Sequence, residues 1–342
     1  MENQVHLLLE ELAKLTPDAQ QEFRQKFNQW LAIPVDETGE AVVYELRAEE
    51  QSKDKPCCPH CQSDQIVGHG DYNGKKRLRC KDCGKTFSHI TGTSAAYIRD
   101  KNKWADYARL MVQGLPLREL AAKVGICLKT AFDWRHKILA SFKQLGYHRL
   151  EGITEADETF FLFSEKGQKD IEYRQSHKRG SQVSKAGIND EHVAVLFSQD
   201  RNNHLLIEVG CRGRVSKKDI KEKLGKWLDT ENGVLCSDAH RSYQAYTKAT
   251  GMEHKILNHS KGQYVREKHY HLQHVNSSHS RVKKWMDRFN GVATKYLQHY
   301  MDYFRILEMI KFSEEKWKEF LAKSLASSQC YTPAKLIINT KI

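Results

Sequence analysis

The chain lacks the features that mark membrane and secreted proteins. It has no apolar run of about 18 residues, the length that spans a bilayer, and its mean hydropathy is -0.68. No basic segment precedes the short leucine run near the N-terminus, so no signal peptide is expected. Internal repeats and low-complexity tracts are also absent. These absences predict a protein that works away from membranes.

The nine cysteines do not have the spacing of a disulfide framework. Four of them form two Cys-x-x-Cys pairs, Cys58 with Cys61 and Cys80 with Cys83. This pattern predicts a zinc ribbon in which four thiolates hold structural Zn²⁺ and a hairpin that turns at Asn73-Gly74 links the two pairs. Cys57 is adjacent to Cys58 and could replace it, but the symmetry of the two pairs would then be lost. Reduced cysteines predict a reducing compartment.

The charge balance points to a polyanionic partner. Lys plus Arg number 55 against 43 Asp plus Glu, which gives a net charge of +12 and a pI near 9.1. Nucleic acid is the first candidate, because neutralising phosphates releases counterions and so drives binding. The alternative is a merely basic protein without such a partner.

Helical periodicity between residues 103 and 145 predicts a helix-turn-helix unit. A helix ends near Gly125, and a second, basic helix begins near Leu128. The second helix would lie in a DNA major groove. Its candidate contacts are Lys129, Thr130, Asp133, Arg135 and His136. A three-helix unit that binds no nucleic acid is the alternative.

Strands and helices alternate after residue 149, which predicts an α/β fold. Two of the predicted strands carry an acid: Asp157 lies among β-formers, and the apolar run from Val234 ends at Asp238. Like charges on neighbouring strands raise each other's pKa, so their approach would call for a divalent cation. Glu158 should face the opposite side of its strand from Asp157.

Further basic residues are candidate DNA contacts. They are Lys178 and Arg179 in a polar loop between residues 166 and 188, Lys261 and Arg266 in a second polar loop, and Lys283 on a helix predicted over residues 271–290. For Lys283, a plain surface lysine is an equally good interpretation.

Taken together, the order of these units resembles the DDE transposases of bacterial insertion sequences, and most closely the insertion sequence 1595 family. The phrases that carry the resemblance are Asp157-Glu158-Thr159, Lys178-Arg179-Gly180, Ser237-Asp238-Ala239-His240-Arg241-Ser242-Tyr243, the run from Asn258 to Arg266, His274-Val275-Asn276-Ser277, and Leu297-x-x-Tyr300. The resemblance covers about residues 56 to 312. It implies a retroviral-integrase-like, or RNase H-like, catalytic domain.

That resemblance also implies a function. The expected function is that of a DNA transposase, which binds the terminal inverted repeats of an insertion sequence and catalyses strand cleavage and strand transfer with two Mg²⁺ or Mn²⁺ ions. Asp157 and Asp238 would hold the metal. Family members often place Glu or Asn where this chain has His279, an imidazole that suits Mn²⁺ better than Mg²⁺. Asp287 is the rival third ligand, and a catalytically dead protein is a further possibility.

We expect five segments. They are a helical N-terminal segment (1–50), a zinc ribbon (51–95), a helix-turn-helix domain (96–148), an RNase H-like catalytic domain (149–315) and a C-terminal tail (316–342), with a linker in the second half of residues 33–55. Joining two element ends in one complex calls for a dimer or larger assembly, in the bacterial cytoplasm at the nucleoid. Two alternatives stay open: a non-catalytic DNA-binding regulator derived from a transposase, and a metal-dependent DNA nuclease without joining activity.

Overall fold

The computed structural model describes most of the chain from residue 39 to residue 326. The described residues are 15–16, 19–21, 39–53, 57–72, 74–143, 145–168, 171, 183, 186–258 and 261–326. The predicted loop contacts Lys178 and Arg179 lie outside these residues, as do almost all of the first 38.

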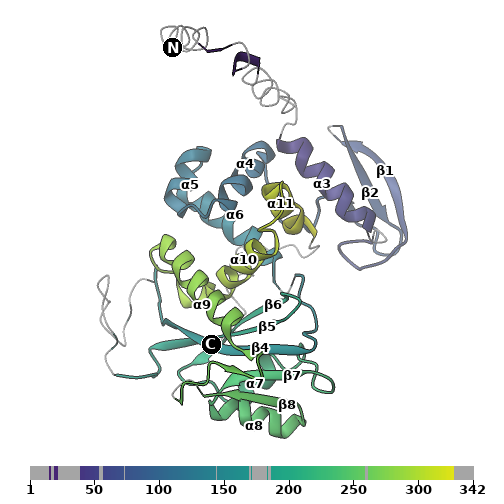
Figure 1. Cartoon of the computed structure of the whole chain (residues 1–342). Helices are drawn as coiled ribbons and strands as arrows, with labels where there is room; N and C mark the ends of the chain where they lie inside the picture. The colour runs from purple at the N-terminus through teal and green to yellow at the C-terminus, as the bar shows by residue number, and fades with distance from the viewer. Residues whose placement is uncertain are drawn as a thin grey trace.

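A five-stranded mixed sheet organises the C-terminal half, in agreement with the predicted α/β class (Figure 1). Its strands are β4 (Ile153–Leu162), β5 (His192–Asp200), β6 (Leu205–Arg212), β7 (Val234–Asp238) and β8 (Glu253–Leu257). Their spatial order is β6-β5-β4-β7-β8. β5 runs antiparallel to both β4 and β6, whereas β4, β7 and β8 are parallel.

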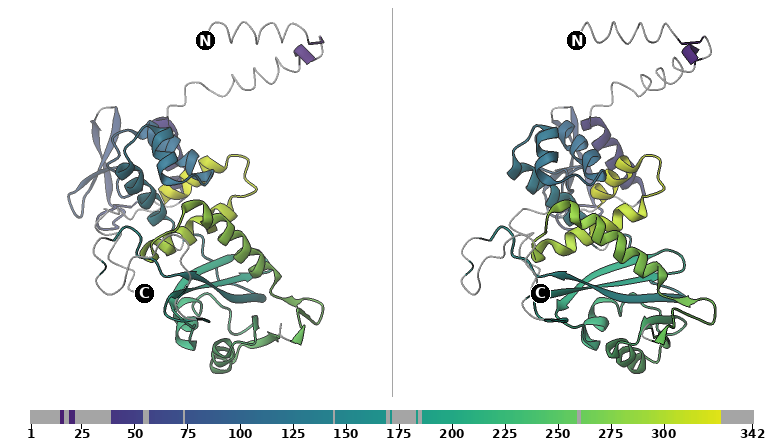
Figure 2. Two further views of the ribbon diagram at one scale, coloured as in Figure 1. Left: turned by 90° about the vertical axis from the view of Figure 1, so that its left-hand side faces the viewer. Right: turned by 60° about the vertical axis from the view of Figure 1, so that its left-hand side comes forward.

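Helices cover both faces of this sheet (Figures 1 and 2). One face packs against α7 (Lys217–Lys223) and α8 (Arg241–Thr250), and the other against α9 (Gln273–Met286) and α10 (Leu297–Met309). Because side chains alternate along a strand, β5 serves both layers. Its odd-numbered residues, such as Phe197, belong to the core shared with α9 and α10, and its even-numbered residues, such as Leu196, to the core shared with α7 and α8.

The N-terminal helices extend the larger of these two cores. They are α3 (Gly39–Lys53), α4 (Lys101–Val112), α5 (Leu117–Val124) and α6 (Leu128–Ser141), and they pack with α10 and with α11 (Lys316–Ala326). The linker predicted in the second half of residues 33–55 is wrong up to residue 53, since α3 runs through it and Leu46 is buried. Residues 316–326, within the predicted tail, form α11, with Phe320 fully buried. Both helices pack on partners far away in sequence, which local periodicity does not reveal.

Two small antiparallel sheets complete the described chain. β1 (Ile66–Tyr72), β2 (Lys75–Cys80) and β3 (Thr86–Ser88) form the first, and β9 (Val265–Arg266) and β10 (Tyr270–His271) the second. Tyr72 pairs with Lys75, so the β1–β2 hairpin turns where predicted, and Gly74 has the left-handed φ of 71° that favours glycine. Two short 3₁₀ turns, η2 (Asp287–Phe289) and η3 (Thr294–Tyr296), lie between α9 and α10. Among the described residues, every helix is too short or too polar to span a membrane.

Candidate active site

The two predicted strand acids lie side by side on the sheet. β4 and β7 are parallel neighbours, with Glu155 paired to Cys236. Asp157 and Asp238 each lie two residues beyond that pair, so they continue the register and project from the same face. Asp238 is the last residue of β7, as the break in the apolar run predicted.

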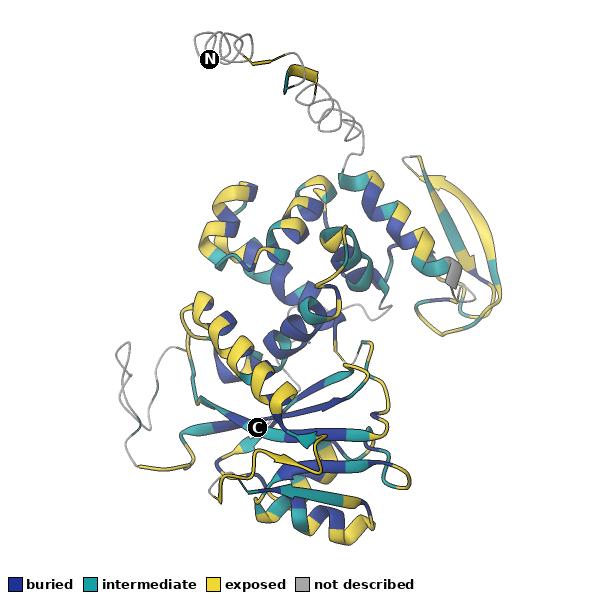
Figure 3. Cartoon of the chain, in the orientation of Figure 1, coloured by how far each residue is buried: buried dark blue, intermediate teal, exposed yellow. Residues whose placement is uncertain are grey.

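Helix α9 places His279 over these acids. Its buried residues, including Val275 and Val282, pack toward the sheet, while its outer face is exposed (Figure 3). The Nδ1 atom of His279 lies 3.8 Å from Oδ2 of Asp157. The other ring nitrogen, Nε2, is buried and has no hydrogen-bond partner among the described residues.

Burial and neighbouring charges shape the electrostatics of the site. Burial, with the charges of Glu158 and Asp238 added, raises the pKa of Asp157 to about 7. Burial and the Lys283 ammonium lower the pKa of His279 to about 4. The imidazole is therefore neutral at pH 7 and has a lone pair to offer, whereas the Lys283 ammonium offsets only a small part of the effects that raise the pKa of Asp157.

A divalent cation fits this arrangement. The 3.8 Å between His279 Nδ1 and Asp157 Oδ2 is too long for a hydrogen bond but lets both atoms reach one ion, since metal–ligand bonds are about 2.1 Å long. The rival ligand Asp287 is exposed and begins η2. It lies roughly 12 Å farther along the helix axis, at 1.5 Å per residue. The fold places His279 next to Asp157, puts Asp238 close enough for its charge to act on Asp157, and leaves Asp287 apart.

Glu158 projects toward the opposite face of the sheet, as the strand alternation predicted. Burial is the main cause that raises the pKa of Glu158, and the nearby His240 and Tyr243 partly offset this rise. Among the described residues, none forms a hydrogen bond with its buried Oε2 atom. Glu158 is therefore a half-buried acid on the opposite face of the sheet from Asp157.

The four predicted zinc ligands form one cluster. Cys58 Sγ lies 3.7 Å from Cys83 Sγ, and Cys61 Sγ lies 3.6 Å from Cys80 Sγ. Sulfur atoms bound to one tetrahedral Zn²⁺ at about 2.3 Å are separated by about 3.8 Å, so the cluster fits a structural zinc ion. Cys57 is exposed and contacts Gln62 instead, so the alternative ligand set is not the one assembled here.

Sequence reasoning missed a buried carboxylate next to the site. Glu155 is fully buried on β4, and its oxygens meet His271, His274 and Arg201. His274 Nδ1 lies 2.7 Å from Glu155 Oε1, a hydrogen-bond distance shorter than the separation expected of two ligands of one ion. Because a guanidinium cation also binds this carboxylate, the cluster is a hydrogen-bonded network. Its signal in the sequence is the two-residue spacing from Asp157, which places both acids on one face.

The first turn of α6 leaves two of the candidate DNA contacts accessible. Lys129 is exposed and Thr130 half-buried, just after the turn at Gly125. The prediction is wrong for Arg135 and His136, which are 1% and 2% exposed. They lie on the inner face of α6, where Arg135 donates to the carbonyl of Leu115.

The remaining basic candidates within the described residues are on the surface. Arg266 is exposed on β9, and Lys261 is exposed in the loop that precedes this strand. Lys283 is exposed one helical turn after His279, and its charge acts on both His279 and Asp157. Of the three, Lys283 is the one close enough for its charge to lower the pKa of both Asp157 and His279.

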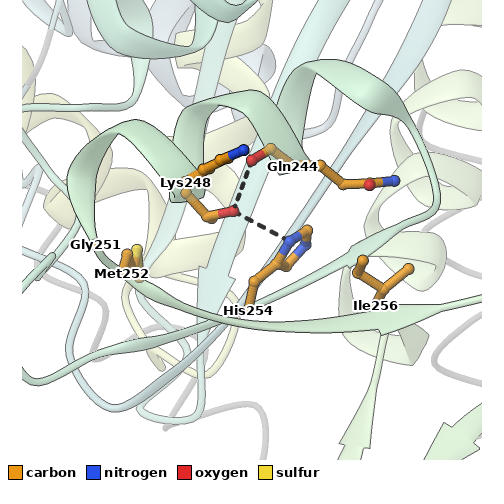
Figure 4. Close-up of a pocket in the computed structure, with 7 residues that line it drawn as sticks. Gln244, Lys248, Gly251, Met252, His254 and Ile256 are labelled. Carbon is orange, nitrogen blue, oxygen red and sulfur yellow. Dashed lines mark hydrogen bonds between the residues drawn. The ribbon is translucent and has the colours of Figure 1, made fainter.

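A shallow pocket lies between α8 and β8, and Figure 4 shows the residues that line it. Within it, His254 Nδ1 lies 3.2 Å from Oγ1 of Thr247, and its Nε2 lies 2.8 Å from Oγ of Ser237. Ser237 faces α8, whereas its neighbour Asp238 faces α9. The pocket therefore opens on the side of the sheet away from the acids.

Residues 149–305 match the ISXO2-like transposase domain. A protein of the transposable element ISH50 from Halobacterium salinarum is 25% identical over 283 residues, which cover 78% of this chain and 91% of that protein.

Among solved structures, two complexes of the Mos1 transposase are similar only at a low level. A pre-cleavage Mos1 transpososome is 13% identical, with 67% of this chain and 79% of that chain covered and a TM-score of 0.20. The Mos1 mariner paired-end complex with Mn is 14% identical, with 65% and 78% covered and a TM-score of 0.20. TM-scores this low do not establish a shared fold. The comparison therefore rests on sequence: the match of residues 149–305 to the ISXO2-like transposase domain and the similarity to the ISH50 protein confirm the resemblance to transposases of the insertion sequence 1595 family.

Proposed function

We propose that this protein is a DDE-type DNA transposase that cleaves and joins DNA at the terminal inverted repeats of its insertion sequence. The observation that carries the proposal is the convergence of Asp157, Asp238 and His279 from β4, β7 and α9. The sheet supports an RNase H-like catalytic domain over residues 149–315. Its first three strands are antiparallel neighbours, and the next two extend the sheet in parallel on the other side of β4.

Asp157, Asp238 and His279 would hold Mg²⁺ or Mn²⁺ in this proposal. When bound, two such ions activate an attacking hydroxyl group and stabilise the leaving oxygen of a phosphodiester. The chain supplies the alignment: Phe197 packs against the His279 ring, and the buried face of α9 fixes the helix on the sheet. The exposed Lys283 ammonium lies beside the acids, where it would contact a DNA phosphate.

Double-stranded DNA is the proposed partner, both as element ends and as target. Lys129 and Thr130 on α6 would contact the terminal repeats, with Lys261 and Arg266 binding the backbone nearer the site. Lys178 and Arg179 are proposed contacts from their sequence context alone. Zn²⁺ on Cys58, Cys61, Cys80 and Cys83 would hold the ribbon together. Two ends require at least two active sites, so we propose a dimer or larger assembly that acts at the bacterial nucleoid.

A strand-transfer assay tests the proposal. Purified protein, labelled terminal-repeat DNA and a target plasmid are incubated with Mn²⁺ or Mg²⁺, and cleavage and joining are scored separately. We expect both products from the wild type and neither from Asp157→Asn or Asp238→Asn, with terminal-repeat binding retained. Binding without cleavage by the wild type would instead indicate a regulator, and cleavage without joining a nuclease.

A further inference from the structure

The N-terminus of α9 lacks a cap of its own. The residue at its N-cap position, Leu272, has no side chain that can accept a hydrogen bond. The first backbone N–H groups of a helix need acceptors, and a buried end without them costs stability. The acceptor comes from another element: Glu155 Oε2 accepts from the backbone N–H of His274 at 3.0 Å and of Val275 at 3.1 Å.

This capping carboxylate belongs to the strand that carries Asp157. Glu155 lies two residues before Asp157 on β4 and projects from the same face. His279 lies five residues into α9 after His274, which is roughly 7.5 Å along the axis. Two points of α9 are thus fixed on β4. Its first turn is bound by Glu155, and His279 lies beside Asp157.

Arg201 connects Glu155 to the neighbouring β9–β10 hairpin. Its guanidinium binds Glu155 Oε1 and donates from Nη2 to the carbonyl oxygen of His269 at 2.9 Å. His269 lies in the turn between β9 and β10, the hairpin that carries Arg266. One buried carboxylate therefore ties together the strand, the helix and the hairpin.

We infer that Glu155 is a positioning residue, which sets α9 on β4 so that His279 completes the divalent-metal site of Asp157 and Asp238. The inference rests on the proposed function, because it assigns Glu155 a task within that metal site. Neither a metal ion nor DNA touches Glu155 in this account. It acts through the helix whose N–H groups it accepts.

The chemistry of the network explains why a carboxylate is needed. A carboxylate has only acceptors, and here it receives two backbone N–H groups and a guanidinium. Gln at this position has nearly the same shape but presents an NH₂ group to one of these donors. The buried donor left unpaired would force the α9 end or Arg201 to move.

The experiment measures Mn²⁺ binding to the intact protein by electron paramagnetic resonance, without any turnover. Titration gives the affinity, and electron spin-echo modulation from ¹⁴N reports whether a histidine ligates the ion. The variants are Glu155→Gln and Arg201→Gln, with His279→Ala as reference for loss of the ¹⁴N signal. Asp200→Asn is the matched control: Asp200 is a buried carboxylate that also accepts two backbone N–H groups, but from its own turn at Asn202 and His204.

We expect Glu155→Gln to weaken Mn²⁺ binding about 10-fold or more, which is the loss of affinity typical when a group that orients a metal ligand is removed. The ¹⁴N signal should fall as well. Asp200→Asn should keep both wild-type values even if its melting temperature falls. Wild-type affinity and ¹⁴N signal in Glu155→Gln would overturn the inference. If that variant does not fold, Arg201→Gln decides, since Arg201 is partly exposed and its loss should weaken the same signal.

Failure of the proposed function gives a different result. If Asp157→Asn binds Mn²⁺ as tightly as the wild type does, the proposed metal site itself is wrong. Binding that depends on Asp157 and His279, but not on Glu155 or Arg201, would leave the metal site standing and remove only the positioning role.

Discussion

The ring of His279 stands edge-on against the ring of Phe197, with 4.6 Å between centroids and an interplanar angle of 87°. Phe197 is also the register partner of Asp157 on the neighbouring strand β5. The residue opposite the first acid therefore sets the orientation of the imidazole above it. This contact links the pairing of β4 and β5 to the placement of α9 on the sheet.

Shortening Phe197 tests that contact. Phe197→Leu removes the ring edge, so the imidazole gains freedom and Mn²⁺ affinity should fall a few-fold, with a loss of about 1 kcal/mol in the free energy of unfolding. Phe142→Leu is the matched control, since Phe142 is equally buried but packs against Phe320 in the helical layer. Isothermal titration with Mn²⁺ and urea unfolding measure the two effects. Equal metal affinities of the two variants would contradict the assigned role.

The third ligand is tested by exchanging it. His279→Ala should lower strand cleavage by at least about 100-fold, because one metal ligand is lost, while Asp287→Asn should retain wild-type activity. His279→Glu restores a carboxylate and should support cleavage with Mg²⁺ as well as Mn²⁺, since hard oxygen ligands suit Mg²⁺. Rates with each metal provide the measurement. Loss of cleavage in Asp287→Asn with activity kept in His279→Ala would reverse the assignment.

Acid should loosen the contact between α6 and α10. His136 Nδ1 lies 3.1 Å from His299 Nδ1. Burial, followed by the His299 charge, lowers the pKa of His136 to about 3, and burial lowers that of His299 to about 4. In the unfolded chain each histidine takes up a proton near pH 6.5. In the folded chain both stay neutral until the pH falls to about 4 or below. Their contribution is therefore intact above pH 6.5 and lost as pH falls toward 4.

The expected loss at pH 5 is about 2 kcal/mol for each histidine, from about 1.4 kcal/mol per pH unit. Urea unfolding of wild type and His299→Gln at pH 7 and pH 5 measures it. The variant should lose less stability between the two pH values. An identical loss in both proteins would show that this pair does not govern the acid response.

Removing zinc should unfold the ribbon. Atomic emission should find one Zn²⁺ bound at this cluster in the wild type. Cys61→Ser, or treatment with a strong chelator, should abolish that zinc signal and weaken DNA binding, because the small ribbon core depends on the metal. Cys57→Ser is the control, since Cys57 lies outside the cluster. Zinc loss in Cys57→Ser with full zinc in Cys61→Ser would contradict the ligand set.

DNA binding should depend on the first turn of α6. Lys129→Ala should weaken binding to terminal-repeat DNA several-fold and reduce its salt dependence by about one counterion, with no change in melting temperature. Lys218→Ala is the control, because Lys218 on α7 has the same 80% side-chain exposure but lies on the opposite layer. Fluorescence anisotropy at several salt concentrations makes the comparison. Equal effects of both lysines would indicate only a general charge contribution.

Local patterns predicted the parts of the fold that depend on near neighbours in sequence. The Cys-x-x-Cys pairs, the hairpin turn before Lys75 and the strand acid at Asp238 all follow from spacing or strand-end composition. The opposite orientations of Asp157 and Glu158 follow from strand alternation. These features need no knowledge of distant partners.

The remaining features depend on tertiary packing. The inner face of α6 carries Arg135 and His136, whose charge and polarity suggest a surface, yet α10 covers them. Glu155 resembles any strand-face acid until α9 is placed above it. Charged residues that are buried through distant partners have the same local pattern as exposed ones, so sequence periodicity assigns them to the surface.

Anomalous scattering from crystals soaked in Mn²⁺ tests the central claim most directly. The account predicts a manganese peak within coordination distance of Asp157, Asp238 and His279, and no such peak in Asp157→Asn crystals. A peak at Glu155, His271 and His274 instead, or none near Asp157 in wild-type crystals, would contradict it.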